Sequence, residues 1–355
     1  MRRVIIDRHH HALFYSLQRL FEDRLGCIVY TPLGQEWWDK GYWRFGEGYG
    51  DDRLARQFLA IGPEWRELDY EQAPGYRTFT GKDNHHPERK ILGVELGAVL
   101  QTPFEWAYIV ATVQDNQRGF HRLARELRET NAGLMTGDAS SPKYVLQVGN
   151  TNQSVDWGLD PLALVSSEVP IRGRGILYHQ EFDSEGVFGY REPEPSTTIR
   201  SFVNCFGSTP CIRVLDDVRR LLPEFTFGVH GIDGPEGNIE TVAEIADLMA
   251  GSAFGWHDKV QGDGFGHVIH DWAAIGRPLI GHAAHYRGLM AEPFWQDGVT
   301  CIDLDRHTPT EAAELVRQIT ADPSRHRAMC EAIRAVFDEQ VDFAAEAERI
   351  REFLS

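Results

Sequence analysis

The first part of the chain alternates between short apolar runs and helix-spaced apolar residues, which predicts strands separated by helices. Val4–Ile6 is a β-branched run, and apolar residues recur at helical spacing over 13–25, before Gly26. A glycine in that position is placed to end a helix. Residues 27–30 form the next apolar run, and we expect this strand to end at Pro32. Strand, helix and strand within about 30 residues have the length of a parallel βαβ unit.

The same alternation continues along the chain, although residues 33–105 are less regular. Further strands are predicted at 108–113, 144–148, 162–165, 175–180, 202–206, 225–231, 253–256, 278–280 and 299–302. Further helices are predicted at 118–129, 211–222, 240–249, 266–275, from a capping box at Thr308 to about 320, from Ser324 onward, and at 341–354. Strands that alternate with helices favour an α/β protein with parallel sheets.

Length and turn residues divide the chain into two Rossmann-like domains. The 355 residues exceed the size of one hydrophobic core. A segment rich in glycine, proline and glutamate, 183–199, is typical of a domain boundary. We expect domains at 1–190 and 191–340, with a ligand cleft between them. For the last helix, within 341–355, a return to the first domain is one option.

The composition is that of a soluble globular protein, with 42% hydrophobic and 25% charged residues. A formal net charge of −17 disfavours nucleic acid as a partner. The five cysteines include no CxxC pair, so we expect reduced thiols and a cytoplasmic location. No apolar stretch approaches the roughly 20 residues that cross a bilayer, so we expect no integral membrane segment.

The stretch from Gly262 to Asp271, GDGFGHVIHD, joins a glycine-rich turn to a predicted helix. Backbone N–H groups at such a turn point beyond the helix N-terminus, and the helix dipole favours an anion there. A diphosphate is a common occupant. Lys259, Arg213 and Arg277 are candidates for neutralising its charge, and Lys259 is favoured because it follows a strand close to the turn.

Two acids, a Phe-Gly pair and a short apolar strand follow one another at fixed spacing. Asp263 and Asp271 flank Phe265-Gly266, and the run AIGRPLI extends from Ala274 to Ile280. In this order and spacing, residues 200–340 resemble the nucleotide-sugar domain of glycosyltransferases with the GT-B fold, especially family-4-like members. That family usually has glutamate at both acidic positions, so the two aspartates depart from its pattern.

The resemblance implies a role for each of these residues. Asp271 would accept hydrogen bonds from the donor ribose hydroxyls, and Asp263 would lie against the transferred sugar as a catalytic residue. The other implied donor-binding residues are Lys259, Arg213, Gly207 and Gly231, with the backbone of Gly264, Phe265 and Gly266 around the diphosphate. GT-B enzymes generally use no metal, so we expect no metal and no cofactor, with a nucleotide sugar such as a UDP-sugar as donor.

Two histidines lie where the first predicted strand ends. There, His9 or His10 can supply a general base near neutral pH. Solvated imidazoles beside a helix cap, and a metal cluster, are the alternatives.

Aromatic and amide side chains supply candidates for acceptor binding. Trp37 and Trp38 can stack on an acceptor, or form a satellite core under a loop. Asn150 and Asn152 can bind hydroxyl groups, or simply form a turn.

We therefore expect a glycosyltransferase that moves a sugar from a nucleotide diphosphate to a small-molecule, glycan or glycoconjugate acceptor. The family resemblance implies retention of the anomeric configuration, whereas a histidine base would favour inversion. A nucleotide-sugar epimerase of the same fold is one alternative. A catalytically silent binding protein is the other, because both acidic positions carry aspartate.

Overall fold

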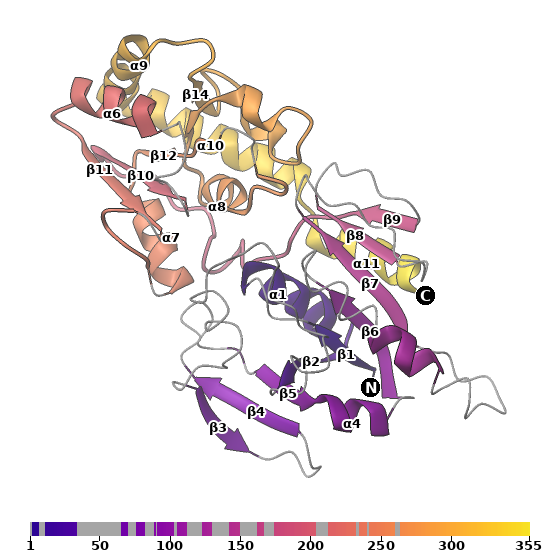
Figure 1. Ribbon diagram of the computed structural model, residues 1–355. Coiled ribbons are helices and arrows are strands. Elements are labelled where there is room, and N and C mark those ends of the chain that lie inside the picture. The colour runs from indigo at the N-terminus through magenta and orange to yellow at the C-terminus, as the bar shows by residue number, and fades with distance from the viewer. Residues whose placement is uncertain are drawn as a thin grey trace. The chain divides into compact units, whose positions relative to one another are not determined.

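The computed structural model describes residues 2–6, 11–33, 65–69, 76–81, 89, 91–102, 105–111, 123–129, 142–149, 162–166, 174–203, 212–231, 234–239, 241–259 and 263–355. The chain folds into two compact units (Figure 1). Unit 1 comprises the chain up to Phe182 together with Phe343–Ser355, and unit 2 comprises Asp183–Asp342. Within the described residues, no helix is both long and apolar enough to cross a membrane.

Unit 1 is built on a nine-stranded sheet in the order β3-β4-β5-β2-β1-β6-β7-β8-β9. Its strands are β1 (Arg3–Ile6), β2 (Ile28–Leu33), β3 (Trp65–Asp69), β4 (Tyr76–Gly81), β5 (Ile91–Glu95), β6 (Trp106–Ala111), β7 (Lys143–Val148), β8 (Leu162–Val165) and β9 (Arg174–Leu177). From β5 to β9 in this order, neighbouring strands are parallel. Strand β4 is antiparallel to both β3 and β5, so an antiparallel edge is added to the expected parallel sheet.

Helices cover both faces of this sheet. Successive strand residues point to opposite faces, so Ile5 belongs to one apolar cluster and Val4 to the other. The Val4 cluster includes residues of three helical segments: α1 (His11–Gln18), the π-helical η1 (Arg19–Arg24) and α11 (Phe343–Leu354). Helix α4 (Leu96–Gln101) and the helical residues 123–129 contribute to the Ile5 cluster.

The C-terminal helix α11 belongs to unit 1 although it follows unit 2 in the sequence (Figure 1). Its buried Glu346 accepts hydrogen bonds from the His179 backbone N–H at 2.7 Å and faces His179 Nδ1 at 2.6 Å. At the other end, Lys143 donates to the Leu354 carbonyl at 2.6 Å. Apolar burial and these polar contacts together fix α11 to the sheet.

Unit 2 contains a five-stranded sheet in the order β11-β10-β12-β13-β14. Its strands are β10 (Thr198–Phe202), β11 (Thr226–His230), β12 (Phe254–Trp256), β13 (Leu279–Gly281) and β14 (Cys301–Asp303). All neighbouring pairs are parallel, which confirms the predicted α/β class. The order reverses direction between β10 and β12, and ligands of such sheets bind beyond the carboxyl ends of the strands at that point.

The helices of unit 2 follow the predicted pattern closely. They are α6 (Ile212–Leu221), α7 (Val242–Ala250), α8 (His267–Ile275), α9 (Pro309–Ala321) and α10 (Pro323–Gln340), with short 3₁₀ segments η4 (Ala283–Tyr286) and η5 (Glu292–Phe294). The predicted capping box is present, because the Thr308 side chain accepts from the Glu311 backbone and Glu311 accepts from the Thr308 backbone.

Candidate functional site

The carboxyl end of β12 carries three polar residues in succession. His257 and Asp258 are only 1% and 2% exposed, and Lys259 is half-buried. The strand itself lies close to α8, because a Cβ atom at Gly255 would come within 2.5 Å of Trp272. These polar groups therefore lie on a rigid part of unit 2, beside the point where the strand order reverses.

Asp263 is held by two of these residues. Its Oδ2 lies 2.8 Å from His257 Nε2, and its Oδ1 accepts a 2.5 Å hydrogen bond from Lys259 Nζ. Burial opposes ionisation, but the hydrogen bond and charge of His257 and the charge of Lys259 outweigh it, so the pKa of Asp263 lies well below its usual range. Asp263 is therefore an ionised carboxylate that is held by a partner at each of its two oxygens.

The glycine-rich turn enters α8 through a left-handed residue. Gly266 has φ +78° and forms the N-cap with no side-chain cap hydrogen bond. His270 fixes this turn, because its Nδ1 lies 2.9 Å from the Gly266 carbonyl oxygen and its ring stacks on Phe265 at 4.0 Å. The turn is thus built without a capping side chain, as expected where backbone amides are to meet an anion.

Asp271 lies one turn inside α8 and is 5% exposed. Burial raises its pKa well above the usual range. Its Oδ1 is buried and has no hydrogen-bond partner among the described residues. A buried carboxyl oxygen without a partner carries a desolvation cost that a ligand hydroxyl can remove.

Three further residues predicted to contact the donor lie in the described part of the chain. Arg213 is exposed in the first turn of α6, and Gly231 follows β11 with φ +138°. Arg277 is 1% exposed, and its guanidinium donates to backbone carbonyls, including Ala250 at 2.7 Å and Arg191 at 2.8 Å. These bonds lie beyond the C-terminal end of α8, so Arg277 holds the fold together there and is not available for a diphosphate at the other end of that helix.

Several predicted residues lie outside the described part of the chain. They are His9, His10, Trp37, Trp38, Asn150, Asn152 and Gly207. Their proposed roles stay predictions.

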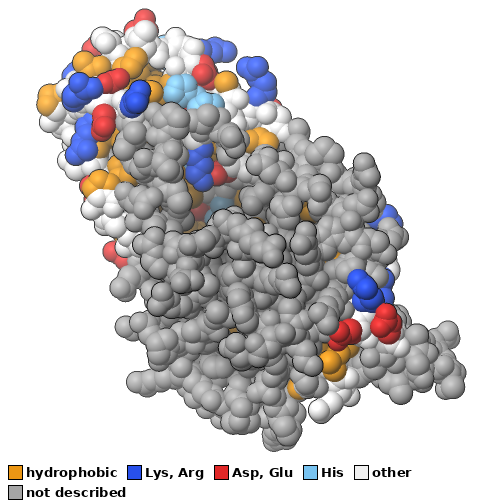
Figure 2. Space-filling model, in the orientation of Figure 1, with side chains coloured by type: hydrophobic (Ala, Val, Ile, Leu, Met, Phe, Trp, Pro, Cys, Tyr) orange, Lys and Arg blue, Asp and Glu red, His pale blue; other side chains and the backbone are white. Residues whose placement is uncertain are grey.

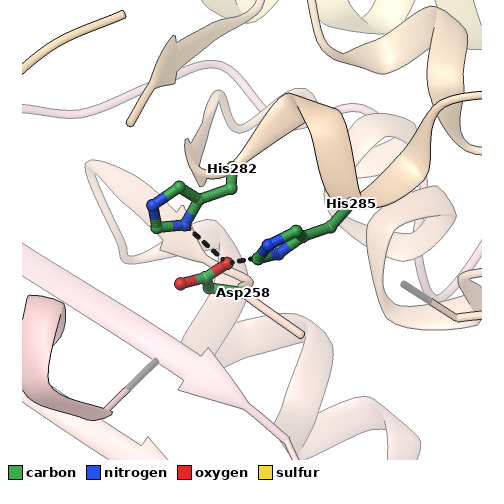
Figure 3. Close-up of side chains that lie close together, drawn as sticks. All are labelled: Asp258, His282 and His285. Carbon is green, nitrogen blue, oxygen red and sulfur yellow. Dashed lines mark hydrogen bonds and ion pairs between the residues drawn. The ribbon is translucent and has the colours of Figure 1, made fainter. Parts of the chain in front are cut away.

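A second polar cluster in unit 2 was not predicted. Asp258 Oδ1 lies 2.9 Å from His282 Nδ1 and 3.0 Å from His285 Nδ1. Both imidazoles point toward this carboxylate in Figure 3. The hydrogen bond to Asp258 raises the pKa of His282, although burial opposes this. The sequence does carry a signal: an acid follows one predicted strand, and two histidines three residues apart follow the next.

The visible surface of unit 2 mixes both signs of charge. Lys and Arg side chains lie among Asp and Glu side chains on its described part in Figure 2. This distribution agrees with the acidic composition and offers no contiguous basic stripe on the described part of that face.

No protein-family model and no curated protein sequence matches the chain. Solved structures match it in fold. HepE of Anabaena in complex with UDP has a TM-score of 0.61 at 12% identity, covering 100% of this chain and 99% of that one.

Two further solved structures have similar scores. An α-glucosyltransferase in complex with UDP and a 13-mer DNA has a TM-score of 0.59 at 10% identity, covering 99% of this chain and 98% of that one. The pneumococcal O-GlcNAc transferase GtfA in complex with UDP and GlcNAc has a TM-score of 0.57 at 11% identity, covering 100% and 99%. The chain therefore has the GT-B fold of these glycosyltransferases.

Proposed function

We propose that the protein is a glycosyltransferase that uses a nucleotide-diphosphate sugar, with UDP as the favoured nucleotide. The observation that carries the proposal is the α8 entrance: a glycine N-cap without a capping side chain, followed one turn later by a buried carboxyl oxygen that lacks a partner among the described residues. The first feature suits a diphosphate and the second suits ribose hydroxyls. The UDP complexes of similarly folded proteins support the same assignment.

In this proposal the diphosphate binds at the N-terminal turn of α8. Breaking the bond between the sugar C1 and the phosphate oxygen leaves an additional negative charge on the diphosphate. The α8 amides and the Lys259 ammonium stabilise that charge as it develops. No metal is required at this position, because the helix terminus and the lysine supply the positive electrostatic potential.

Asp263 positions Lys259 and lies next to the transferred sugar. Its carboxylate is ionised and already bonded to the Lys259 ammonium, which holds that cation in one place. The acceptor hydroxyl attacks C1 from the side of the leaving phosphate, whose oxygen takes the hydroxyl proton. The anomeric configuration is then retained.

Nucleotide binding to the chain tests the donor site. Thermal shifts are measured with UDP and a panel of other nucleotide diphosphates and nucleotide sugars, for the wild type, Asp271→Ala and the matched control Asp216→Ala, an exposed acid on α6. We expect a shift for the wild type and the control and none for Asp271→Ala. Equal shifts in all three proteins would remove Asp271 from the site.

Product analysis separates the proposal from its alternatives. An epimerase converts the donor sugar without an acceptor, whereas a transferase hydrolyses the donor slowly and transfers the sugar when an acceptor is present. A silent binding protein shifts in melting temperature with nucleotide but leaves the donor intact over long incubation. The anomer of the product distinguishes retention from inversion.

A further inference from the structure

We propose that Asp258, His282 and His285 form a binding site for a divalent transition-metal ion of the Zn²⁺ class. This site is additional to the donor site, and its test does not depend on the proposed function.

The three ligand atoms already have nearly the spacing that a metal ion requires. One carboxylate oxygen and two imidazole nitrogens lie within 4.8 Å of one another, and Asp258 Oδ1 is 2.9 and 3.0 Å from the two nitrogens. Ligand atoms about 2.1 Å from a tetrahedral ion are about 3.4 Å apart. An ion therefore fits after a small outward movement of the imidazoles, with the hydrogen-bonding protons lost.

Local backbone geometry explains why the two imidazoles converge. His282 is the N-cap of the 3₁₀ segment η4, and His285 lies within it. In a 3₁₀ helix there are 3.0 residues per turn, so side chains three apart eclipse each other. The two rings accordingly have centroids 4.9 Å apart, and both face Asp258 in Figure 3.

Asp258 is brought to these rings by the sheet. Strands β12 and β13 are parallel neighbours with Trp256 opposite Ile280, so the residues that follow both strands emerge at the same edge. Gly281 permits the approach, because a Cβ atom there would lie 2.2 Å from the His257 carbonyl oxygen. The ligands thus stand on a rigid scaffold, as metal sites require.

The electrostatic surroundings favour a cation. The Asp258 side chain is fully buried, whereas those of His282 and His285 are 20% and 21% exposed, which gives an ion access from solvent. Two further carboxylates hold the histidine segment: Asp303 accepts from the Ala283 backbone at 3.1 Å and Asp305 from the Ala284 backbone at 2.7 Å.

The donor set selects the type of ion. Two imidazoles with one carboxylate suit Zn²⁺, Co²⁺ or Ni²⁺, whereas Mg²⁺ and Ca²⁺ prefer oxygen ligands. Three protein ligands leave a fourth position for water or for an oxygen of a bound molecule. We expect sugar transfer itself to need no metal. The ion proposed here is assigned no part in that reaction.

Zn²⁺ alone is the probe, added to full-length, tag-free chain after chelator treatment. Bound zinc is measured by equilibrium dialysis and elemental analysis for the wild type, His285→Ala and His307→Ala. His307 is the matched control, because it also pairs with an aspartate, Asp297, at 3.0 Å, and this pair contains a single histidine. His9, His10 and His11 also carry imidazoles. The site is therefore tested by the difference in bound zinc between the three proteins.

We expect the wild type and His307→Ala each to bind one equivalent of Zn²⁺. Their affinity for it should exceed that of His285→Ala by about 100-fold or more. Asp258→Asn, checked for folding by circular dichroism, is expected to lose the same equivalent. The visible spectrum of the Co²⁺-loaded wild type provides a reading that needs no variant, since a four-coordinate site gives intense bands. Absence of stoichiometric uptake by the wild type, or uptake unchanged in both variants, overturns the proposal.

Discussion

Lys259 and Asp263 form an ion pair in which the ammonium nitrogen lies 2.5 Å from a carboxylate oxygen. The pair is four residues apart in the sequence and stands between the end of β12 and the start of α8. Its geometry makes the lysine a positioned cation and not a mobile surface charge.

Removal of the Lys259 charge is expected to impair turnover of a nucleotide-sugar donor. Lys259→Ala should lower kcat/KM by about 100-fold, the usual cost of losing one group that stabilises a developing anion. Lys259→Arg keeps the charge with a different geometry and should retain part of the activity. Initial rates of donor consumption give the answer. A loss of less than threefold in the alanine variant contradicts this role.

Asp271→Asn is expected to stabilise the protein at neutral pH. Burial raises the folded-state pKa of Asp271, so the folded state keeps a proton that the unfolded state releases. The free energy of unfolding of the wild type is therefore lowered as pH rises above about 4, the ordinary pKa of an aspartate. The asparagine variant does not lose stability in this way, so its melting temperature should exceed that of the wild type by a few degrees at pH 7.

The pH dependence of the difference in melting temperature between Asp271→Asn and the wild type provides the control. At pH 3.5 the Asp271 carboxyl is mainly protonated in both states, so the two melting temperatures should converge. A difference that stays constant from pH 3.5 to 7 would show that the stabilisation has another origin.

Asp263 should change the pH dependence of protein stability in the opposite direction to Asp271. Although burial opposes ionisation, its partners lower its folded-state pKa, so its stabilising effect is present above about pH 4 and is lost as pH falls toward the folded-state value. Asp263→Asn should be less stable than the wild type at pH 6, and the gap should narrow as pH falls to 3. Urea unfolding at several pH values measures this, with Asp217→Asn on the α6 surface as a control.

Gly255→Ala should destabilise unit 2 by about 1–3 kcal/mol, because the new methyl group would overlap the Trp272 ring. Gly251→Ala is the matched control: the nearest atom to its Cβ, the Asp247 carbonyl oxygen, is at an ordinary 3.5 Å, and φ is −78°. Chemical denaturation of both variants gives the comparison. Equal midpoints would show that the strand and helix can move apart at little cost.

The strongly periodic elements of unit 2 could be predicted from the sequence. The Thr308 capping box is a local signal and occurs as expected, and α8 covers nearly the predicted range. Strand β10 is different, because it begins at Thr198, inside the segment that composition marks as a boundary. Its start is set by parallel pairing of Thr198 with Thr226, and such pairing leaves no trace in local hydrophobicity.

Unit 1 shows how pairing overrides a local signal. Strand β2 continues past Pro32 to Leu33, although proline usually interrupts a strand. The partner β1 ends at Ile6, and the register pairs Ile5 with Tyr30, so within the described residues Pro32 is paired with Val94 of β5 on the other side. Because the Ile28 N–H donates to the Arg2 carbonyl, the backbone nitrogen of Pro32 also faces β1, at the end of the β1–β2 ladder, where a missing N–H is tolerated. The antiparallel edge strands were missed for the same reason, since their pairing is not local.

The polar sites were only partly predictable. The spacing of Asp263 and Asp271 around a glycine turn was visible in the sequence, whereas their opposite pKa shifts depend on burial and partners. His257 was missed because a histidine after an apolar strand is usually a core residue. The Asp258 cluster was missed because its ligands come from two strands that only the sheet brings together.

The return of α11 to unit 1 has a consequence for biosynthesis. The segment Asp183–Asp342 interrupts the sequence of unit 1, so a growing polypeptide exposes the whole of unit 2 before α11 leaves the ribosome. Unit 2 can fold as one uninterrupted stretch, whereas the Val4 cluster has only its α1 and η1 residues as helical cover until Ala347, Ile350 and Leu354 arrive. A nascent chain halted near residue 342 would therefore offer chaperones the part of this apolar surface that α11 later covers.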